Sequence, residues 1–225
     1  MTKGLTGNQL KLIALVTMTL DHIGHYLFPH LLLLRLVGRL AMPIYAFFIA
    51  EGCRHTRSMA GYLRTMVLMG LLCSVVTLCA GSLYQSILVT FSMSIGLIFL
   101  LKKALNTKNI LWYLLFTAAL AAVWFVTETL PGLLHGTDFD VDYGFWGAIL
   151  PVIVWLMPKK WCQLFAAAAV MTVMAFSNPL QLFAFGALVP LALYNGQRGA
   201  RNLKWLFYWY YPVHLAILNL IAMLL

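Results

Sequence analysis

Residues 110–130 read ILWYLLFTAALAAVWFVTETL, a run in which Glu128 is the only charged side chain. A helix needs about 20 consecutive apolar residues to cross the hydrocarbon core of a bilayer. Inside lipid every backbone polar group must be paired within its own segment, so an apolar run of this length is predicted to be helical. This stretch therefore predicts a membrane-spanning helix.

The composition of the whole chain agrees with that stretch. Of the 225 residues, 63% are hydrophobic and 9% are charged, and the mean hydropathy is +0.89. A soluble domain carries about 25% charged residues, and the 6 acidic residues here are too few to solubilise a surface of this size. The composition excludes a soluble domain, a disordered tail and a secreted disulfide scaffold, and it predicts an all-α, polytopic membrane bundle.

Nine apolar segments occupy nearly the whole chain, which predicts a single polytopic membrane domain over residues 1–225. Turn-forming pairs separate them, for example Phe28-Pro29, Gly81-Ser82 and Asn178-Pro179. The sixth to eighth segments are short, so one of them could be re-entrant. The predicted spans are 10–28, 31–53, 62–81, 84–101, 110–130, 142–157, 161–177, 179–194 and 204–224.

The charges between the spans orient the chain. Cytoplasmic loops carry an excess of Lys and Arg, and basic connections alternate here with connections that carry no cation. The alternation predicts nine spans with the N-terminus inside and the C-terminus outside. The basic connections hold Lys3 and Lys11; Arg54, Arg57 and Arg64; Lys102, Lys103 and Lys108; Lys159 and Lys160; and Arg198, Arg201 and Lys204.

The net charge of +9 follows from the same rule. These cations face anionic headgroups, so we expect the lipid bilayer as their partner and no nucleic acid. The N-terminal apolar stretch is not expected to be a cleavable signal peptide, because it is long and contains Asp21 and His22. The 4 scattered cysteines predict neither a disulfide nor a zinc site.

Several ionisable residues fall inside the predicted spans, where a charge costs at least about 2.5–3.5 kcal/mol and normally faces a cavity or a partner. Asp21 and His25 are i,i+4 neighbours on one helix, and Arg35 and Arg39 share a face of the next. Because the turn at Pro29 makes these helices antiparallel, we expect Asp21 to meet Arg39. The whole set is Asp21, His22, His25, Arg35, Arg39, Glu51, Glu128 and His214, of which Glu128 is expected to be interfacial.

His214 lies near the middle of the last span, after Pro212. Pro212 is expected to kink that helix and free a carbonyl, so His214 could face the Asp21 cluster. Two alternatives stay open. Asp21 and Arg39 could form a purely structural ion pair, and Asp21 with two histidines could bind a metal, although no outer-shell partners are visible and we expect none.

The cytoplasmic ends of two spans carry a second polar group. Residues 50–57 read AEGCRHTR and residues 194–199 read YNGQRG. Glycines permit close backbone approach, and arginines suit phosphate oxygens. Each stretch alone is typical of a positive-inside loop, whereas together with a histidine-containing cavity they indicate a phosphate-bearing cofactor entering from the cytoplasm. The spacing matches neither a P-loop nor a dinucleotide fingerprint.

Taken together, these motifs resemble the TraX family of integral membrane proteins over nearly the whole chain. Members of the wider group are similar to membrane acyltransferases that take acetyl from cytoplasmic acetyl-CoA, and the namesake is associated with N-terminal acetylation of conjugative pilin. Residues 82–90 match no motif, so the acceptor is not carried over. The matching stretches are LDHIG (20–24), RLVGRLAMP (35–43), FIAEGCRHTR (48–57), DYG (142–144), YNGQRG (194–199) and YPVH (211–214).

The resemblance implies a role for each group. His22 would be the general base or the nucleophile, positioned by Asp21 and Arg39, with Arg39 or Arg35 stabilising the oxyanion and His214 as a second candidate base. Acetyl-CoA, the acetyl donor, would be bound by Glu51, Arg54, His55, Arg57, Asn195 and Arg198. The acceptor, a pilin or peptide amine, would be bound by Asp142, Tyr143 and His25, although the positive-inside rule alone also explains the acidic loop.

Other functions stay open. An O-acetyltransferase of a cell-envelope glycan would use the same residues with a hydroxyl acceptor. A proton-coupled transporter would use Asp21, His22 and His214 as a relay, although an odd span count and the lack of an inverted repeat weaken it. A scaffold for pilus or envelope assembly would need no intramembrane His or Arg. The sequence leaves open the oligomeric state and a choice between direct transfer and an acetyl-histidine.

Overall fold

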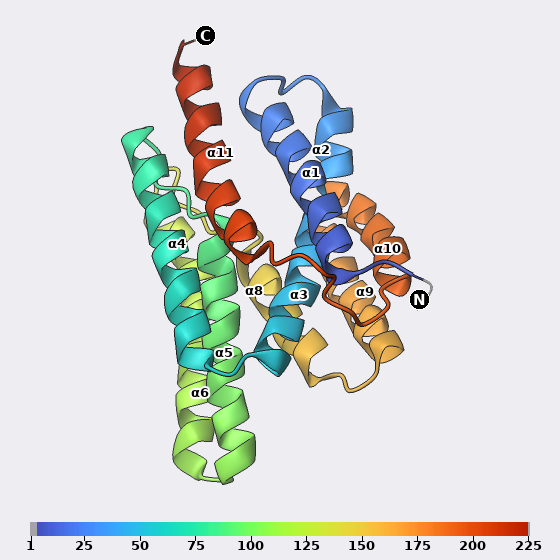
Figure 1. The fold of residues 1–225 in the computed structure, drawn as a ribbon. Helices are drawn as coiled ribbons and strands as arrows, with labels where there is room; N and C mark the ends of the chain where they lie inside the picture. Colours follow the sequence, from blue (N-terminus) through green and yellow to red (C-terminus); the bar gives the residue numbers. More distant parts are fainter. Residues whose placement is uncertain (1–3, 225) are drawn as a thin grey trace. The chain divides into compact units, whose positions relative to one another are not determined.

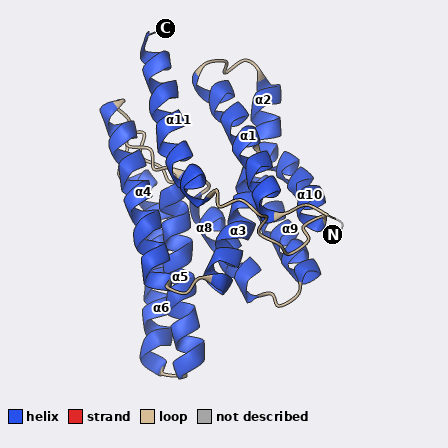
Figure 2. Ribbon diagram, in the orientation of Figure 1, coloured by secondary structure: helices blue, strands red, loops and turns tan. Residues whose placement is uncertain are grey.

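The computed structural model describes residues 4–224, which form helices joined by loops, with two isolated β-bridges and no strand within that range (Figure 2). The prediction of an all-α membrane protein is confirmed. Within the described range, six helical stretches are long and apolar enough to cross a membrane. They are 32–55, 59–79, 87–107, 110–133, 160–177 and 204–224.

Three further helical stretches coincide with the remaining predicted segments. α1 (Gly7–Tyr26) is 20 residues long but is less apolar, because it carries Lys11, Asp21 and two histidines. α8 (Gly144–Leu156) has 13 residues, which extend only about 20 Å. The stretch 179–192 consists of the 3₁₀ helix η2 (Pro179–Ala187) and the short α10 (Leu188–Ala192). The short lengths predicted for these last two segments are confirmed.

The chain, predicted as one domain, divides into two compact units, and the division falls inside α3 (Ala41–His55). The first unit comprises Met1–Phe48 and Met157–Leu225, and the second comprises Ile49–Leu156. Each unit is described separately below.

In the first unit, α1 and α2 (Leu32–Gly38) lie side by side and antiparallel (Figure 1). The N-terminus of α1 is closed by a capping box between Thr6 and Gln9. α1 and α2 approach closely because α1 has a glycine at the crossing, where a Cβ on Gly24 would lie 2.8 Å from the Leu34 Cβ. The unit is completed by α9 (Lys160–Ser177), η2, α10 and α11 (Lys204–Leu224).

The predicted span 31–53 is not one continuous helix. α2 ends at Gly38, and α3 begins at Ala41. Pro43 has no N–H with which to reach the carbonyl of Arg39, so the regular hydrogen-bond ladder is broken there. The turn before the break is tightened: Arg39 N donates to both Arg35 O (3.2 Å) and Leu36 O (3.3 Å), and Leu40 N donates to Val37 O (3.3 Å).

In the second unit, α5 (Ile87–Thr107) packs against α4 (Met59–Cys79), α6 (Ile110–Trp124) and α8. Side-chain caps begin two of these helices, because Ser58 accepts a hydrogen bond from Gly61 N (3.0 Å) and Asn109 accepts one from Leu111 N (2.9 Å). Between α5 and α8, the buried Ser94 hydroxyl donates to the carbonyl of Ala148 (2.7 Å).

The span that begins at Ile110 ends irregularly. α6 passes into a π-helix, η1 (Phe125–Thr129), and then into α7 (Leu130–Leu133). η1 carries Glu128, whose Oε1 accepts a hydrogen bond from Phe145 N (2.8 Å). Glu128 thus caps the N-terminus of α8, where an acidic side chain is favourable.

Candidate functional site

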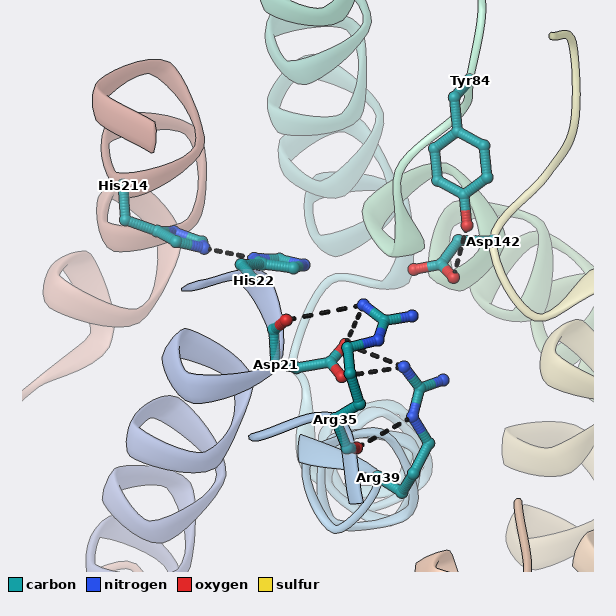
Figure 3. A network of polar contacts seen from close by, with 7 residues as sticks. All are labelled: Asp21, His22, Arg35, Arg39, Tyr84, Asp142 and His214. Atoms are coloured by element: carbon teal, nitrogen blue, oxygen red, sulfur yellow. Dashed lines mark hydrogen bonds and ion pairs between the residues drawn. The ribbon is translucent and has the colours of Figure 1, made fainter. Parts of the chain in front are cut away.

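The first unit contains a buried ion cluster centred on Asp21. Arg39 Nη2 donates to both carboxylate oxygens of Asp21, at 2.8 Å and 3.0 Å. Arg35 Nη1 lies 3.4 Å from Asp21 Oδ2 and 3.5 Å from the Asp21 carbonyl oxygen. Figure 3 shows both guanidinium groups converging on this one carboxylate. The predicted meeting of Asp21 and Arg39 is confirmed.

The spacing of the RLVGR stretch explains this geometry. Arg35 and Arg39 project from the same face of α2 and its C-cap, and Arg39 Nε donates to the Arg35 carbonyl (3.3 Å). Gly38 is buried between them, and a Cβ on it would overlap the side chain of Asp21. Sequence reasoning assigned no role to Gly38. The available signal was a lone glycine inside an apolar span, one residue from a predicted partner of Asp21.

His22 and His214 form a second polar pair, in which His214 is buried and His22 is half-buried. His22 Nδ1 and His214 Nε2 are 2.6 Å apart, and the rings are stacked with an interplanar angle of 11° and centroids 4.9 Å apart. His214 Nδ1 lies 2.8 Å from the carbonyl oxygen of Tyr210. The prediction that His214 faces the polar residues of the first span is therefore confirmed.

The partner of His22 differs from the sequence expectation. Asp21 and Arg39 are expected from the sequence to position His22, yet the Asp21 carboxylate is bound by the two arginines, and His22 shares a hydrogen bond with His214. Successive helical residues point about 100° apart, so Asp21 and His22 face different helices. His25 joins neither group: it is exposed, with its ring against the edge of Tyr26 (centroids 4.9 Å apart).

The end of α3, in the second unit, holds the other predicted cluster. Arg54 Nη1 lies 2.5 Å from Glu51 Oε1, and His55 Nε2 lies 3.4 Å from Glu51 Oε2. Arg54 Nη2 also donates to the carbonyls of Val154 (2.6 Å) and Trp155 (2.9 Å), at the C-terminus of α8. A cation is favourable at such an end, where carbonyls lack helical partners. Arg54 therefore already has a structural use, whereas Arg57 is exposed.

The other residues predicted to bind the donor lie in the loop after α10, in the first unit. Arg198 is exposed, and its Nη2 donates to Asn202 Oδ1 (2.6 Å). Asn195 Oδ1 accepts a hydrogen bond from Gln197 N (2.9 Å). The loop is fixed to the start of α1, since Gly7 N donates to Gln197 O (2.7 Å). Lys160, which the sequence analysis gave as a cation of a cytoplasmic connection, donates from Nζ to Ala192 O (2.7 Å) at the end of α10.

The predicted acceptor residues Asp142 and Tyr143 lie in the second unit, in the loop before α8. The Tyr84 hydroxyl donates to Asp142 Oδ1 (2.7 Å; Figure 3), and the Thr90 hydroxyl donates to the Asp142 carbonyl (2.7 Å). Tyr143 has a left-handed backbone conformation (φ 61°), which is uncommon for a residue with a side chain. The loop is thus held in one specific conformation.

Residues 82–90, which match no family motif, are the segment that holds this loop. Leu83 N donates to Asp138 Oδ1 (2.9 Å), and an isolated parallel bridge pairs Gln85 with Val141. Hydrogen bonds from Ser82 and Leu83 N lower the pKa of Asp138 below its ordinary value. Sequence reasoning could not find this pairing, because the two segments are separated by α5, α6 and α7.

The charge balance of the first unit leaves cations in excess. Asp21 is its only acidic residue, and both of the arginines that contact it are cationic. Within residues 4–224, no group of three or more His, Cys, Asp or Glu side chains is arranged to hold a metal ion. The arrangement is suited to general-base chemistry at a histidine and to stabilising negative charge near the arginines.

Comparison with known proteins gives a family and two curated relatives. The family model described as "TraX protein" matches residues 6–222, which confirms the resemblance found in the sequence. The "Probable fimbrial assembly protein FimC, serogroup H1" of Dichelobacter nodosus is 30% identical over 246 residues, covering 93% of this chain and 93% of that protein. An uncharacterized protein of Rickettsia prowazekii (strain Madrid E) is 54% identical over 39 residues, 17% of this chain and 16% of that protein. No solved structure matches.

Proposed function

The chain belongs to the TraX family, and on that premise we propose that it is a membrane acetyltransferase. In this proposal it moves acetyl from cytoplasmic acetyl-CoA to an amine, at a pilin or peptide N-terminus, on the outer side of a bacterial inner membrane. The observation that carries the proposal is the His22–His214 contact, which lies next to the Asp21–Arg35–Arg39 cluster because Asp21 and His22 are adjacent in α1. A scaffold would have no use for ionisable groups that are this costly to bury in a membrane.

The reaction can be assigned to this chain's own side chains. The acceptor amine nitrogen forms a C–N bond to the acetyl carbonyl carbon, and the C–S bond to coenzyme A breaks. His22 Nε2 takes the proton that the amine loses and returns it to the departing thiolate. Arg35, which is the more accessible of the two arginines (24% against 7% for the Arg39 side chain), is the proposed oxyanion donor.

Two further observations support the choice of acceptor and of the residues proposed to bind the phosphates of the donor. The name of the Dichelobacter nodosus relative contains "fimbrial assembly", which supports a fimbrial subunit as acceptor over an envelope glycan. Among the arginines expected to bind the donor, Arg57 and Arg198 have exposed side chains, while Arg54 is engaged with Glu51 and α8. We therefore keep Arg57, in the second unit, and Arg198, in the first, as two separate candidates for a phosphate contact, each to be substituted singly.

The acetyltransferase proposal is tested by acetyl-CoA binding and turnover by the purified protein in detergent. His22→Asn is the informative variant, because its amide can still donate to His214 while the base at Nε2 is removed. We expect wild type to bind and slowly hydrolyse acetyl-CoA, His22→Asn to bind without hydrolysis, and the control His30→Gln, at an exposed position, to behave as wild type. Absence of binding by folded wild-type protein would overturn the proposal and favour a transporter.

The proposed topology of nine spans, N-terminus inside and C-terminus outside, is tested with the native thiols. Cys79 and Cys162 are exposed, whereas Cys53 and Cys73 are buried. In the proposed topology Cys79 lies near the outer face, and Cys162 follows the cytoplasmic pair Lys159-Lys160. A membrane-impermeant maleimide should label Cys79 in intact spheroplasts and Cys162 only after permeabilisation. Labelling of Cys162 in intact spheroplasts and of Cys79 only after permeabilisation would invert the topology. Labelling of both under the same condition would mean that an even number of spans separates Cys79 from Cys162.

A further inference from the structure

The hydrogen bonds through the two histidines have a single direction. A carbonyl oxygen only accepts, so the contact from His214 Nδ1 to Tyr210 O (2.8 Å) places the proton on Nδ1. A neutral imidazole carries one N–H, so His214 Nε2 is then an acceptor. Its partner at 2.6 Å is His22 Nδ1, which must therefore carry the hydrogen. The remaining nitrogen of His22, Nε2, is left with an unprotonated lone pair.

The surroundings favour a neutral His22 and hold both rings in place. Asp21 with Arg35 and Arg39 carries one net positive charge beside His22, and positive charge opposes protonation of a neighbouring imidazole. Figure 3 shows His22 between these arginines and His214. The His214 ring is stacked on Tyr210 (centroids 5.1 Å apart, 18°) and meets the Tyr211 ring nearly edge-on (84°).

A second contact fixes the register of α11 against α1. The hydroxyls of Thr19 and Tyr210 are 2.8 Å apart, one helical turn from the His22–His214 contact on each helix. Tyr210 thus supplies both the carbonyl that orients His214 and a side chain that docks on α1. Because Tyr210 makes both contacts, the packing of α11 against α1 determines which nitrogen of His214 is protonated.

We propose that His214 is a positioning residue, which holds His22 in its Nδ1–H tautomer and thereby selects His22 Nε2 as the atom that takes the acceptor's proton. His214 itself touches no reacting atom. The reaction step rests on the proposed acetyltransferase function, whereas the tautomer rests on the helix contact alone. His214, a second candidate base from the sequence, thus becomes the residue that orients His22.

The tautomer is measured directly by ¹⁵N NMR of protein in detergent, with ¹⁵N-labelled histidine and His22 assigned by comparison with His22→Asn. We expect His22 to be protonated at Nδ1 and unprotonated at Nε2 in wild type. His214→Gln should preserve this state, because its amide oxygen can accept from His22 Nδ1, whereas His214→Leu should give a mixture of tautomers. A His22 protonated at Nε2 in wild type would overturn the proposal.

Activity supplies the second readout. We expect His214→Leu to lower kcat by about 10²-fold with KM little changed, as for loss of a correctly prepared base, and His214→Gln to recover most of it. Equal loss in both variants, with wild-type thermal unfolding in His214→Gln, would contradict positioning. A wild-type protein with the expected tautomer but no acetyl-CoA turnover would instead contradict the proposed function and leave the tautomer standing. His30→Gln is again the matched control.

Discussion

Asp21 and Glu51 each pair with two basic side chains, but they do so in different ways. The partners of Glu51 are Arg54 and His55, three and four residues further along the same helix, and the side chain of His55 is 78% exposed. The partners of Asp21 come from the next helix and its C-cap, 14 and 18 residues away, and the Asp21 and Arg39 side chains are only 12% and 7% exposed.

The difference shows what each cluster depends on. The Glu51 pairs need only a helix, because residues three and four apart lie on one face. The Asp21 cluster needs α1 and α2 to pack at one register, with Gly24 and Gly38 at the crossing. Removing one partner of a buried pair leaves an uncompensated charge, whereas Arg54 also bonds to the carbonyls at the end of α8 and His55 is exposed to solvent.

The matched substitutions Asp21→Asn and Glu51→Gln should separate the two clusters most strongly. Asp21→Asn leaves two arginines without a counter-charge and should destabilise the protein by about 3–5 kcal/mol and abolish turnover. Glu51→Gln should cost less, because Arg54 keeps its hydrogen bonds to the carbonyls of Val154 and Trp155. Unfolding of both variants in detergent, followed by circular dichroism, measures the difference. Equal losses would show that the buried and the helix-end clusters are energetically alike.

The double variant Asp21→Asn/Arg39→Leu tests whether the Asp21–Arg39 ion pair has a structural or a catalytic role. Replacing a buried ion pair with uncharged side chains is often close to neutral in stability, so we expect the double variant to unfold at a higher temperature than Asp21→Asn alone. Acetyl-CoA turnover should stay lost. Recovery of turnover together with stability would assign the pair a purely structural role.

Gly38→Ala tests the packing that brings the buried cluster together. Its Cβ would overlap the Asp21 side chain, so α1 and α2 must separate, at a cost of about 1–3 kcal/mol and with reduced turnover. Gly96→Ala is the control, because a Cβ there meets no atom within 4 Å. Thermal unfolding of the two variants checks this, and a Gly38→Ala protein as stable as Gly96→Ala would refute the close contact.

Tyr84→Phe removes one hydrogen bond from the loop before α8. The Tyr84 hydroxyl lies 2.7 Å from Asp142 Oδ1, and a hydrogen bond to a charged group contributes about 1.5–3 kcal/mol, reduced here because the contact is exposed to solvent. We expect a modest loss of protection of residues 138–142 in hydrogen exchange, with the α1–α2 pair unaffected. Loss of protection in α1 would instead indicate coupling between the two regions.

Low pH should loosen the loop before α8 by less than the substitution Tyr84→Phe does. Hydrogen bonds from Ser82 and Leu83 N lower the pKa of Asp138 in the folded state. The stabilisation is therefore fully present above the ordinary Asp pKa of about 3.9 and is lost as the pH falls through the lowered value. Limited proteolysis between residues 134 and 142 should rise below about pH 4 in wild type, and this rise should be weaker in Asp138→Asn, whose amide oxygen accepts hydrogen bonds at every pH.

Several parts of the fold and of the site follow from local patterns. The apolar run 110–130 predicts its helix, and the structure has helical residues from Ile110 to Leu133. The i,i+4 spacing of Arg35 and Arg39, with the turn at Pro29, was enough to predict the contact with Asp21. The break between Gly38 and Ala41 could also have been read from Pro43, whose effect on the preceding turn is local.

The sequence by itself determined that this protein is a helical membrane bundle and which ionisable residues must find partners, because lipid permits neither unpaired backbone nor unpaired charge. The tertiary structure was needed to find the other partners. It paired His22 with His214 across 192 residues and residues 82–85 with the acidic loop. Such pairings depend on the register of one helix or loop against another, and spacing along the chain carries no information about that register.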